Sequence, residues 1–170
     1  MKQRSKDSSQ LAEFFLDSVK DIFWAENHLV KSLPKLKNAA KASQLKLAID
    51  QHLEITRGHV ARLVKMFEIL GEKPISRRCE AMKGLILEGE QAIEETKEGT
   101  AVRDLAINFA CLKVEYYEII VYKGLSDLAT RLGYTEVASL LNQTFKEEQE
   151  SANTLGRMGE IFTGNAMTET

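Results

Sequence analysis

Six residues of metal-binding type, four glutamates and two histidines, fall on the apolar faces of predicted helices: Glu26, His52, His59, Glu115, Glu118 and Glu148. A helix advances about 100° per residue, so the apolar residues three and four positions away show which side faces inward. A buried carboxylate costs several kcal/mol unless a basic partner, a proton or a cation compensates it. No arginine or lysine falls on the inward stripes, so protons and cations remain. A pair of iron or manganese ions would compensate four carboxylates better than protons.

The spacing of the candidates limits how they can share ions. His52 and His59 are seven residues apart on one predicted helix, which is about two turns or 10 Å. Both face inward, but they cannot easily bind the same ion, so we expect at most one of them to be a ligand. Glu115 and Glu118 are one turn apart and can present two carboxylates to one point.

The depth of each candidate in a helical bundle provides a further test. Antiparallel pairing about the predicted turns places Glu148 at the depth of Glu115–Glu118, and Glu26 between Thr56 and His59. A single inward glutamate or histidine is usually a hydrogen-bonded core residue. The metal hypothesis therefore depends on all four long helices presenting such a group at matching depth.

The helices that must position these residues follow from apolar periodicity and from stop signals. Four long helices are predicted at 9–40, 43–70, 100–132 and 135–162, and a shorter one at 79–96. Ser43 and Thr100 are candidate N-caps, and Gly71 and Gly133 are candidate stops. Two short hairpin loops and one long crossover carrying the short helix form the connection of an all-α, ferritin-like antiparallel four-helix bundle. We expect one domain at 9–163, with flexible segments at 1–8 and 164–170.

Two helical faces are predicted to lie outside the core. On the third long helix, Phe109, Tyr116 and Ile120 fall on the nominally exposed side, which suggests a homodimer contact through helix surfaces. On the fourth long helix, Glu147 and Glu150 turn away from the stripe that holds the candidate ligand.

Composition excludes several other classes of protein. The chain has 170 residues, 44% of them apolar and 28% charged, with a net charge of -2, which does not indicate nucleic-acid binding. No apolar run approaches the length of a membrane span, and the N-terminus lacks the apolar stretch of a signal peptide. Cys79 and Cys111 have no zinc or redox spacing and are interpreted as core thiols, so a cytoplasmic location is the default expectation.

Several segments resemble one protein family. They are Trp24-Ala25-Glu26, His52-Leu53-Glu54 with Thr56, Arg78 to Leu85, Val102-Arg103-Asp104, Lys113 to Ile119, and Leu128 to Gly133. The sequence is similar, from about Gln10 to Gly159, to the YciE/YciF-like stress-response family, a bacterial branch of the ferritin-like superfamily. The resemblance implies a ferritin-like bundle, often dimeric, with the inward carboxylates of rubrerythrin-like proteins.

The resemblance carries ligand roles to four residues: Glu26, Glu115, Glu118 and Glu148. The second long helix matches less well, because Thr56 and His59 stand where ferritins and rubrerythrins have a Glu-x-x-His motif, and the adjacent position is Ile55. Ser151 also stands where a histidine would follow Glu148. These departures leave at least one metal position short of ligands.

Two hypotheses for function remain. In the first, the chain is a non-haem di-iron or di-manganese protein of oxidative stress that reduces peroxide or oxygen, or oxidises iron. Two ions per subunit fit this hypothesis, with one as an alternative, and Tyr116, Tyr117 and Tyr122 are candidates for redox relays or for core packing. In the second, it is a non-enzymatic stress-induced scaffold with a degenerate or empty metal site. Either hypothesis leaves open whether the protein is an enzyme.

Overall fold

The computed structural model describes the backbone of residues 2–169 and the side chains of residues 10–169, and this part of the chain is helical with no strand. Its helices are α1 (Lys2–Ala39), α2 (Ser43–Leu70), α3 (Glu80–Glu94), α4 (Ala101–Leu132) and α5 (Thr135–Thr168). The predicted all-α fold is confirmed.

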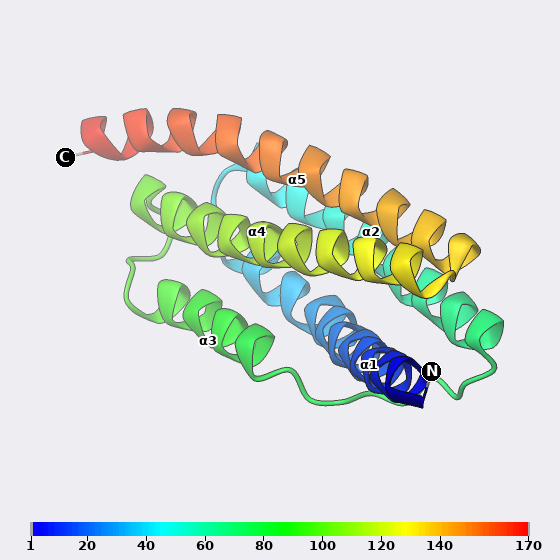
Figure 1. The fold of residues 1–170 in the computed structure, drawn as a ribbon. Coiled ribbons are helices and arrows are strands. Elements are labelled where there is room, and N and C mark those ends of the chain that lie inside the picture. Colours follow the sequence, from blue (N-terminus) through cyan, green and yellow to red (C-terminus); the bar gives the residue numbers. More distant parts are fainter. Residues whose placement is uncertain (1, 170) are drawn as a thin grey trace.

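The four long helices form two hairpins, α1 with α2 and α4 with α5, joined by a long crossover (Figure 1). The short helix α3 lies in this crossover and packs on the outside of α4 and α1. The α4–α5 pair packs extensively, whereas α2 and α5 approach each other much less closely. The connection is the one predicted, and α2 and α5 face each other across one seam between the two hairpins.

Most predicted helix ends are confirmed by local geometry. Gly71 and Gly133 adopt left-handed φ angles of 70° and 81°, and their N–H groups bond carbonyls of the preceding helix, which ends α2 and α4. Only glycine adopts this conformation without steric cost. The hydroxyl of Thr100 accepts a hydrogen bond from the N–H of Arg103 and so caps α4.

The start of α2 differs from the prediction. Ser43 is the first helical residue and not the cap, and the preceding residue, Ala42, has no side chain that can accept a hydrogen bond. The carboxylate of Asp104 accepts from the backbone N–H groups of Lys41 (2.6 Å) and Ala42 (2.9 Å) instead. The cap therefore comes from α4, and it fastens one hairpin to the other.

The last helix is longer than predicted. It continues to Thr168, through most of the segment 164–170 that we expected to be flexible. The following residue, Glu169, accepts a hydrogen bond from the N–H of Ala101 and pairs with Lys41 at 2.8 Å. These contacts tie the end of α5 to the starts of α2 and α4.

The first helix also exceeds its predicted bounds. It begins at Lys2, where residues 1–8 were expected to be flexible, and none of residues 2–9 is a glycine or a proline that would interrupt it. Met1 and Thr170 lie outside the described residues.

The core of the bundle is apolar at both ends and polar in the middle. Phe15, Val19, Leu45 and Leu141 are among its fully buried apolar side chains. Buried glutamates and histidines form a layer between the apolar ends. None of the described helices is long and apolar enough to cross a membrane.

Candidate metal centre

The polar layer contains all six residues selected from the sequence. They come from four helices: Glu26 on α1, His52 and His59 on α2, Glu115 and Glu118 on α4, and Glu148 on α5. Each is at most 8% exposed, and five are at most 1% exposed. Their convergence follows from the antiparallel register of the two hairpins.

One group of potential ligands consists of His52, Glu115, Glu118 and Glu148. Each can place one nitrogen or oxygen atom within 4.8 Å of a donor atom from each of the others. The Nε2 atom of His52 lies 3.3 Å from Oε1 of Glu115. The other ring nitrogen, Nδ1, lies 3.2 Å from the hydroxyl of Ser151, so this serine holds the imidazole with Nε2 toward the carboxylates.

A second group consists of Glu26, His59 and Glu148. The Nδ1 atom of His59 lies 3.0 Å from Glu148 and 3.3 Å from Glu26. The buried hydroxyl of Tyr122 donates a hydrogen bond to Oε1 of Glu26. Because Glu148 belongs to both groups, each histidine has a place of its own, and His52 and His59 both reach the centre. Both histidines therefore face inward as predicted, and the expectation that at most one of them is a ligand stays a prediction.

Many buried polar atoms of this layer have no hydrogen-bond partner. Among the described residues, nine buried side-chain nitrogen and oxygen atoms lack a hydrogen-bond partner, and all but Asn108 Oδ1 belong to the two groups. They include both carboxylate oxygens of Glu118 and of Glu148, Nε2 of His52 and Nδ1 of His59. Buried polar atoms are nearly always paired, so these atoms need protons or cations between them, as at the 3.0 Å approach of Nδ1 of His59 to Glu148.

The donors suit a pair of metal ions. Two ligand atoms that each lie about 2.1 Å from one ion at a right angle are about 3 Å apart, close to the 3.0 and 3.3 Å separations at His59. Four carboxylates and two neutral imidazoles are balanced by two divalent ions. Mixed carboxylate and imidazole ligands suit iron and manganese.

Without cations, the layer must hold protons. Burial and the charge of Glu148 raise the pKa of Glu115 and of Glu118 well above 4.5. Burial alone lowers the pKa of His59, but the carboxylates of Glu26 and Glu148 outweigh it and raise this pKa to about 11. The metal-free centre therefore carries protons that metal ions would displace.

One residue beside the centre, Glu147, does not lie where the sequence predicted. Glu147 was expected to turn away, yet its Oε2 lies 2.9 Å from Nε2 of His59. Its carboxylate also receives hydrogen bonds from Arg62 at 2.8 and 3.0 Å. Although partial burial opposes ionisation, the bonds from Arg62, Gln143 and His59 lower the pKa of Glu147 to about 2. The long side chain of Arg62 reaches the seam between α2 and α5 from one turn beyond His59, and this i, i+3 spacing was the signal in the sequence.

The three tyrosines have different surroundings. Tyr122 is buried and contacts the centre through Glu26. The hydroxyl of Tyr117 lies 3.0 Å from the thiol of Cys79 and donates to Asp21 at 3.4 Å, outside both groups. Tyr116 is 56% exposed. Only Tyr122 is placed to act on the candidate ligands.

Comparison with known proteins shows the family of this chain. The family described as a domain of unknown function, DUF892, matches residues 10–167. The chain belongs to the DUF892 family. Within it, the chain is 39% identical over 140 residues to protein YciF of Escherichia coli, an alignment that covers 82% of this chain and 84% of YciF.

Solved structures share the fold of this DUF892 chain. The E. coli stress protein YciF superposes with a TM-score of 0.86 at 35% identity, covering 91% of this chain and 97% of YciF. YcfI of Rhodopseudomonas palustris, for which a structural role has been suggested, gives a TM-score of 0.83 at 32% identity, covering 86% of this chain and 92% of YcfI. A protein of Xanthomonas campestris pv. campestris, 19% identical with a TM-score of 0.75 over 92% of this chain and 96% of its own, shares the fold alone.

Proposed function

We propose that this DUF892 chain binds two iron or manganese ions in the bundle core and uses them in redox chemistry. One ion is assigned to His52, Glu115, Glu118 and Glu148, and the other to Glu26, His59 and Glu148. Eight buried nitrogen and oxygen atoms without hydrogen-bond partners support the proposal, because they all belong to the residues of these two groups. Bound there, the ions supply single electrons for the reduction of peroxide or oxygen, or are themselves oxidised.

The chain supports its ligands through neighbouring groups. Ser151 orients His52, and Tyr122 donates to Oε1 of Glu26, the oxygen that lies 3.3 Å from Nδ1 of His59. Glu147 accepts at Nε2 of His59 and thereby turns Nδ1 toward the second group. Such outer partners fix the tautomer and orientation of a ligating histidine.

A role in oxidative stress, in the cytoplasm, completes the proposal. The E. coli relative is described as a stress protein, and we extend that role to this chain. Cys79 and Cys111 are free buried thiols, the state expected in a reducing compartment.

The proposal is tested by metal analysis of protein purified without chelators and reconstituted with ferrous or manganous ions. We expect about two ions per chain, and about one or fewer in Glu148→Gln, because the shared carboxylate serves both groups. Glu160→Gln is the matched control, since Glu160 is exposed on the same helix. Less than about one ion per two wild-type chains would contradict the proposal.

A second candidate function is that of a structural protein acting through its surface. It is favoured by the exposure of Phe109, Tyr116 and Ile120, which are 58%, 56% and 72% exposed on α4. We propose that this face forms a homodimer, because exposed apolar patches mark interaction sites. In sedimentation experiments, Ile120→Asp should shift the protein to a monomer. A wild-type chain that is monomeric at all concentrations would refute the dimer.

A further inference from the structure

A cavity of about 220 Å³ lies in the seam between α2 and α5 and reaches the candidate metal centre. Four helices contribute to its lining, but α2 and α5 form most of it. At this level the seam carries the small side chains of Ala48, Ser151 and Thr154, and these leave the space that larger residues would fill.

The inner end of the cavity is polar. His52 and Glu115 form it, together with the thiol of Cys111. The Nε2 atom of His52 and Oε2 of Glu115 are among the buried atoms without hydrogen-bond partners. A molecule in the cavity therefore faces the side chains assigned to the first metal ion.

The walls of the cavity are apolar. They are formed by Leu33, Ile49, Ile55 and Leu155. A volume of about 220 Å³ has room for a short branched alkyl group and a polar head, since about 150 Å³ is enough for benzene. Water and hydrogen peroxide are too small and too polar to make van der Waals contacts with most of these apolar side chains.

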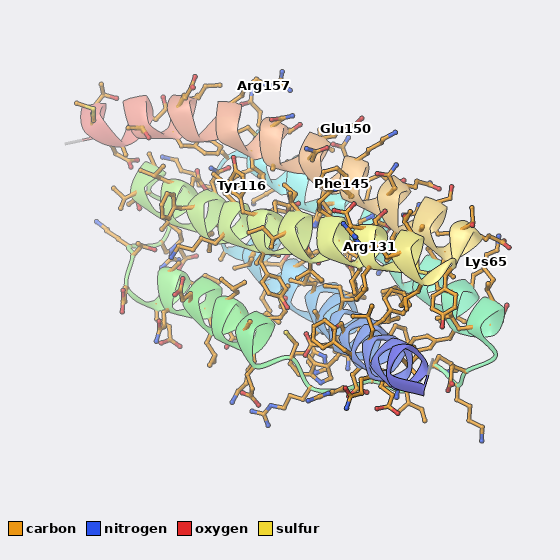
Figure 2. The ribbon with its side chains drawn as sticks, viewed as in Figure 1. Lys65, Tyr116, Arg131, Phe145, Glu150 and Arg157 are labelled. Atoms are coloured by element: carbon orange, nitrogen blue, oxygen red, sulfur yellow. The ribbon has the colours of Figure 1, made fainter. Side chains whose placement is uncertain are left out.

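The charges at the cavity disfavour anions. Glu147 and Glu150 lie among its lining residues, and no lysine or arginine does. Glu150 stands on the outer side of α5 (Figure 2). Two hydrogen bonds from Arg62 balance the charge of Glu147, so the anion-repelling charge in the lining comes from Glu150, and no lining cation offsets it. The arrangement selects an uncharged ligand with an apolar body.

We propose that this cavity binds small alkyl hydroperoxides, with the alkyl group between α2 and α5 and the O–O bond at His52 and Glu115. This inference rests on the proposed function. In the overall reaction the O–O bond breaks and ROOH, two electrons and two protons give ROH and water. Two divalent ions, oxidised to the trivalent state, supply the electrons, and solvent supplies the protons.

Binding is tested first without metal, by NMR of methyl-labelled protein with tert-butyl alcohol as an unreactive analogue. The methyl signals of Ile49, Ile55 and Leu155 should shift, and pivalate, an anion of similar shape, should bind roughly tenfold more weakly or worse. Ala48→Phe fills the cavity and should abolish the shifts. Ala61→Phe, an exposed position on the same helix, should leave them unchanged.

Reactivity is then tested in one turnover of the ferrous-loaded protein. Ala48→Phe should slow oxidation by tert-butyl hydroperoxide roughly tenfold or more, and should change oxidation by hydrogen peroxide much less. If that variant does not fold, Thr154→Leu fills the same cavity, with the exposed Thr163→Leu as its control.

The two proposals fail in different ways. A chain that takes up no metal overturns the proposed function and with it the hydroperoxide chemistry. The cavity inference alone is overturned if the chain binds metal but tert-butyl alcohol does not shift its methyl signals. It is also overturned if Ala48→Phe and Ala61→Phe react with tert-butyl hydroperoxide at the same rate.

Discussion

Replacement of Glu118 by glutamine should stabilise the metal-free protein while removing a metal ligand. Glu118 is fully buried, and neither of its carboxylate oxygens has a hydrogen-bond partner. Burial, followed by the charges of Glu148, Glu26 and Glu115, raises its pKa well above 4.5. Glutamine has nearly the same shape and never needs to take up a proton.

The size of the effect follows from proton linkage. In the unfolded chain Glu118 is ionised above pH 4.5, whereas the folded metal-free chain keeps it protonated. Between pH 4.5 and the raised pKa of the folded state, each pH unit costs the wild-type fold about 1.4 kcal/mol. A group with a raised pKa stabilises the fold only below its unfolded pKa. The advantage of Glu118→Gln should therefore vanish near pH 4.5 and grow as the pH rises.

Urea denaturation of chelator-treated protein at several pH values measures this difference. A gain of about 1.4 kcal/mol per pH unit corresponds to about 3–6 °C in melting temperature for a chain of this size. Glu150→Gln should have little effect, because Glu150 is exposed. After metal is restored the order should reverse, since only the wild type gains the full binding energy. A difference that is independent of pH, or a metal-free variant less stable than wild type at pH 7, would refute the reasoning.

Three further predictions concern the groups around the centre. Arg62→Met should release Glu147 from its two hydrogen bonds and weaken metal binding by the Glu26, His59 and Glu148 group about 10- to 100-fold. An unchanged metal affinity in chelator competition would contradict the positioning role of Glu147. Metal loading at pH 8 should expel protons, because a pKa of about 11 keeps the metal-free His59 charged there, and calorimetry in two buffers of different ionisation heat should show it. Asp104→Ala should cost about 1–3 kcal/mol of stability, because two backbone N–H groups before α2 lose their acceptor, and an unaltered urea midpoint would count against this cap.

The sequence was sufficient to predict the fold and the inward position of the six candidate residues. Apolar periodicity shows which side of each helix is buried, and the turns at Gly71 and Gly133 set the register. Once both hairpins are antiparallel, Glu26 must meet His59 and Glu148 must meet Glu115. These relations depend only on the helical period and on loop lengths.

Contacts made by long side chains across a seam could not be predicted in this way. Glu147 and Arg62 lie off the apolar stripes of their helices, yet they meet because α2 and α5 separate enough to admit them. A helical wheel gives the direction of Cβ but not the reach of the side chain or the local helix spacing. The cap supplied by Asp104 was missed for the same reason, since it comes from a distant part of the sequence.

Because Glu148 belongs to both groups, the binding of one metal ion should affect the binding of the other. Although burial opposes ionisation, hydrogen bonding from His59 lowers the pKa of Glu148, so this carboxylate is ionised before metal binds. An ion at either position would hold it in place for the neighbouring ion. Loading should consequently be cooperative. When metal is scarce, most chains should hold either two ions or none, and few should hold one.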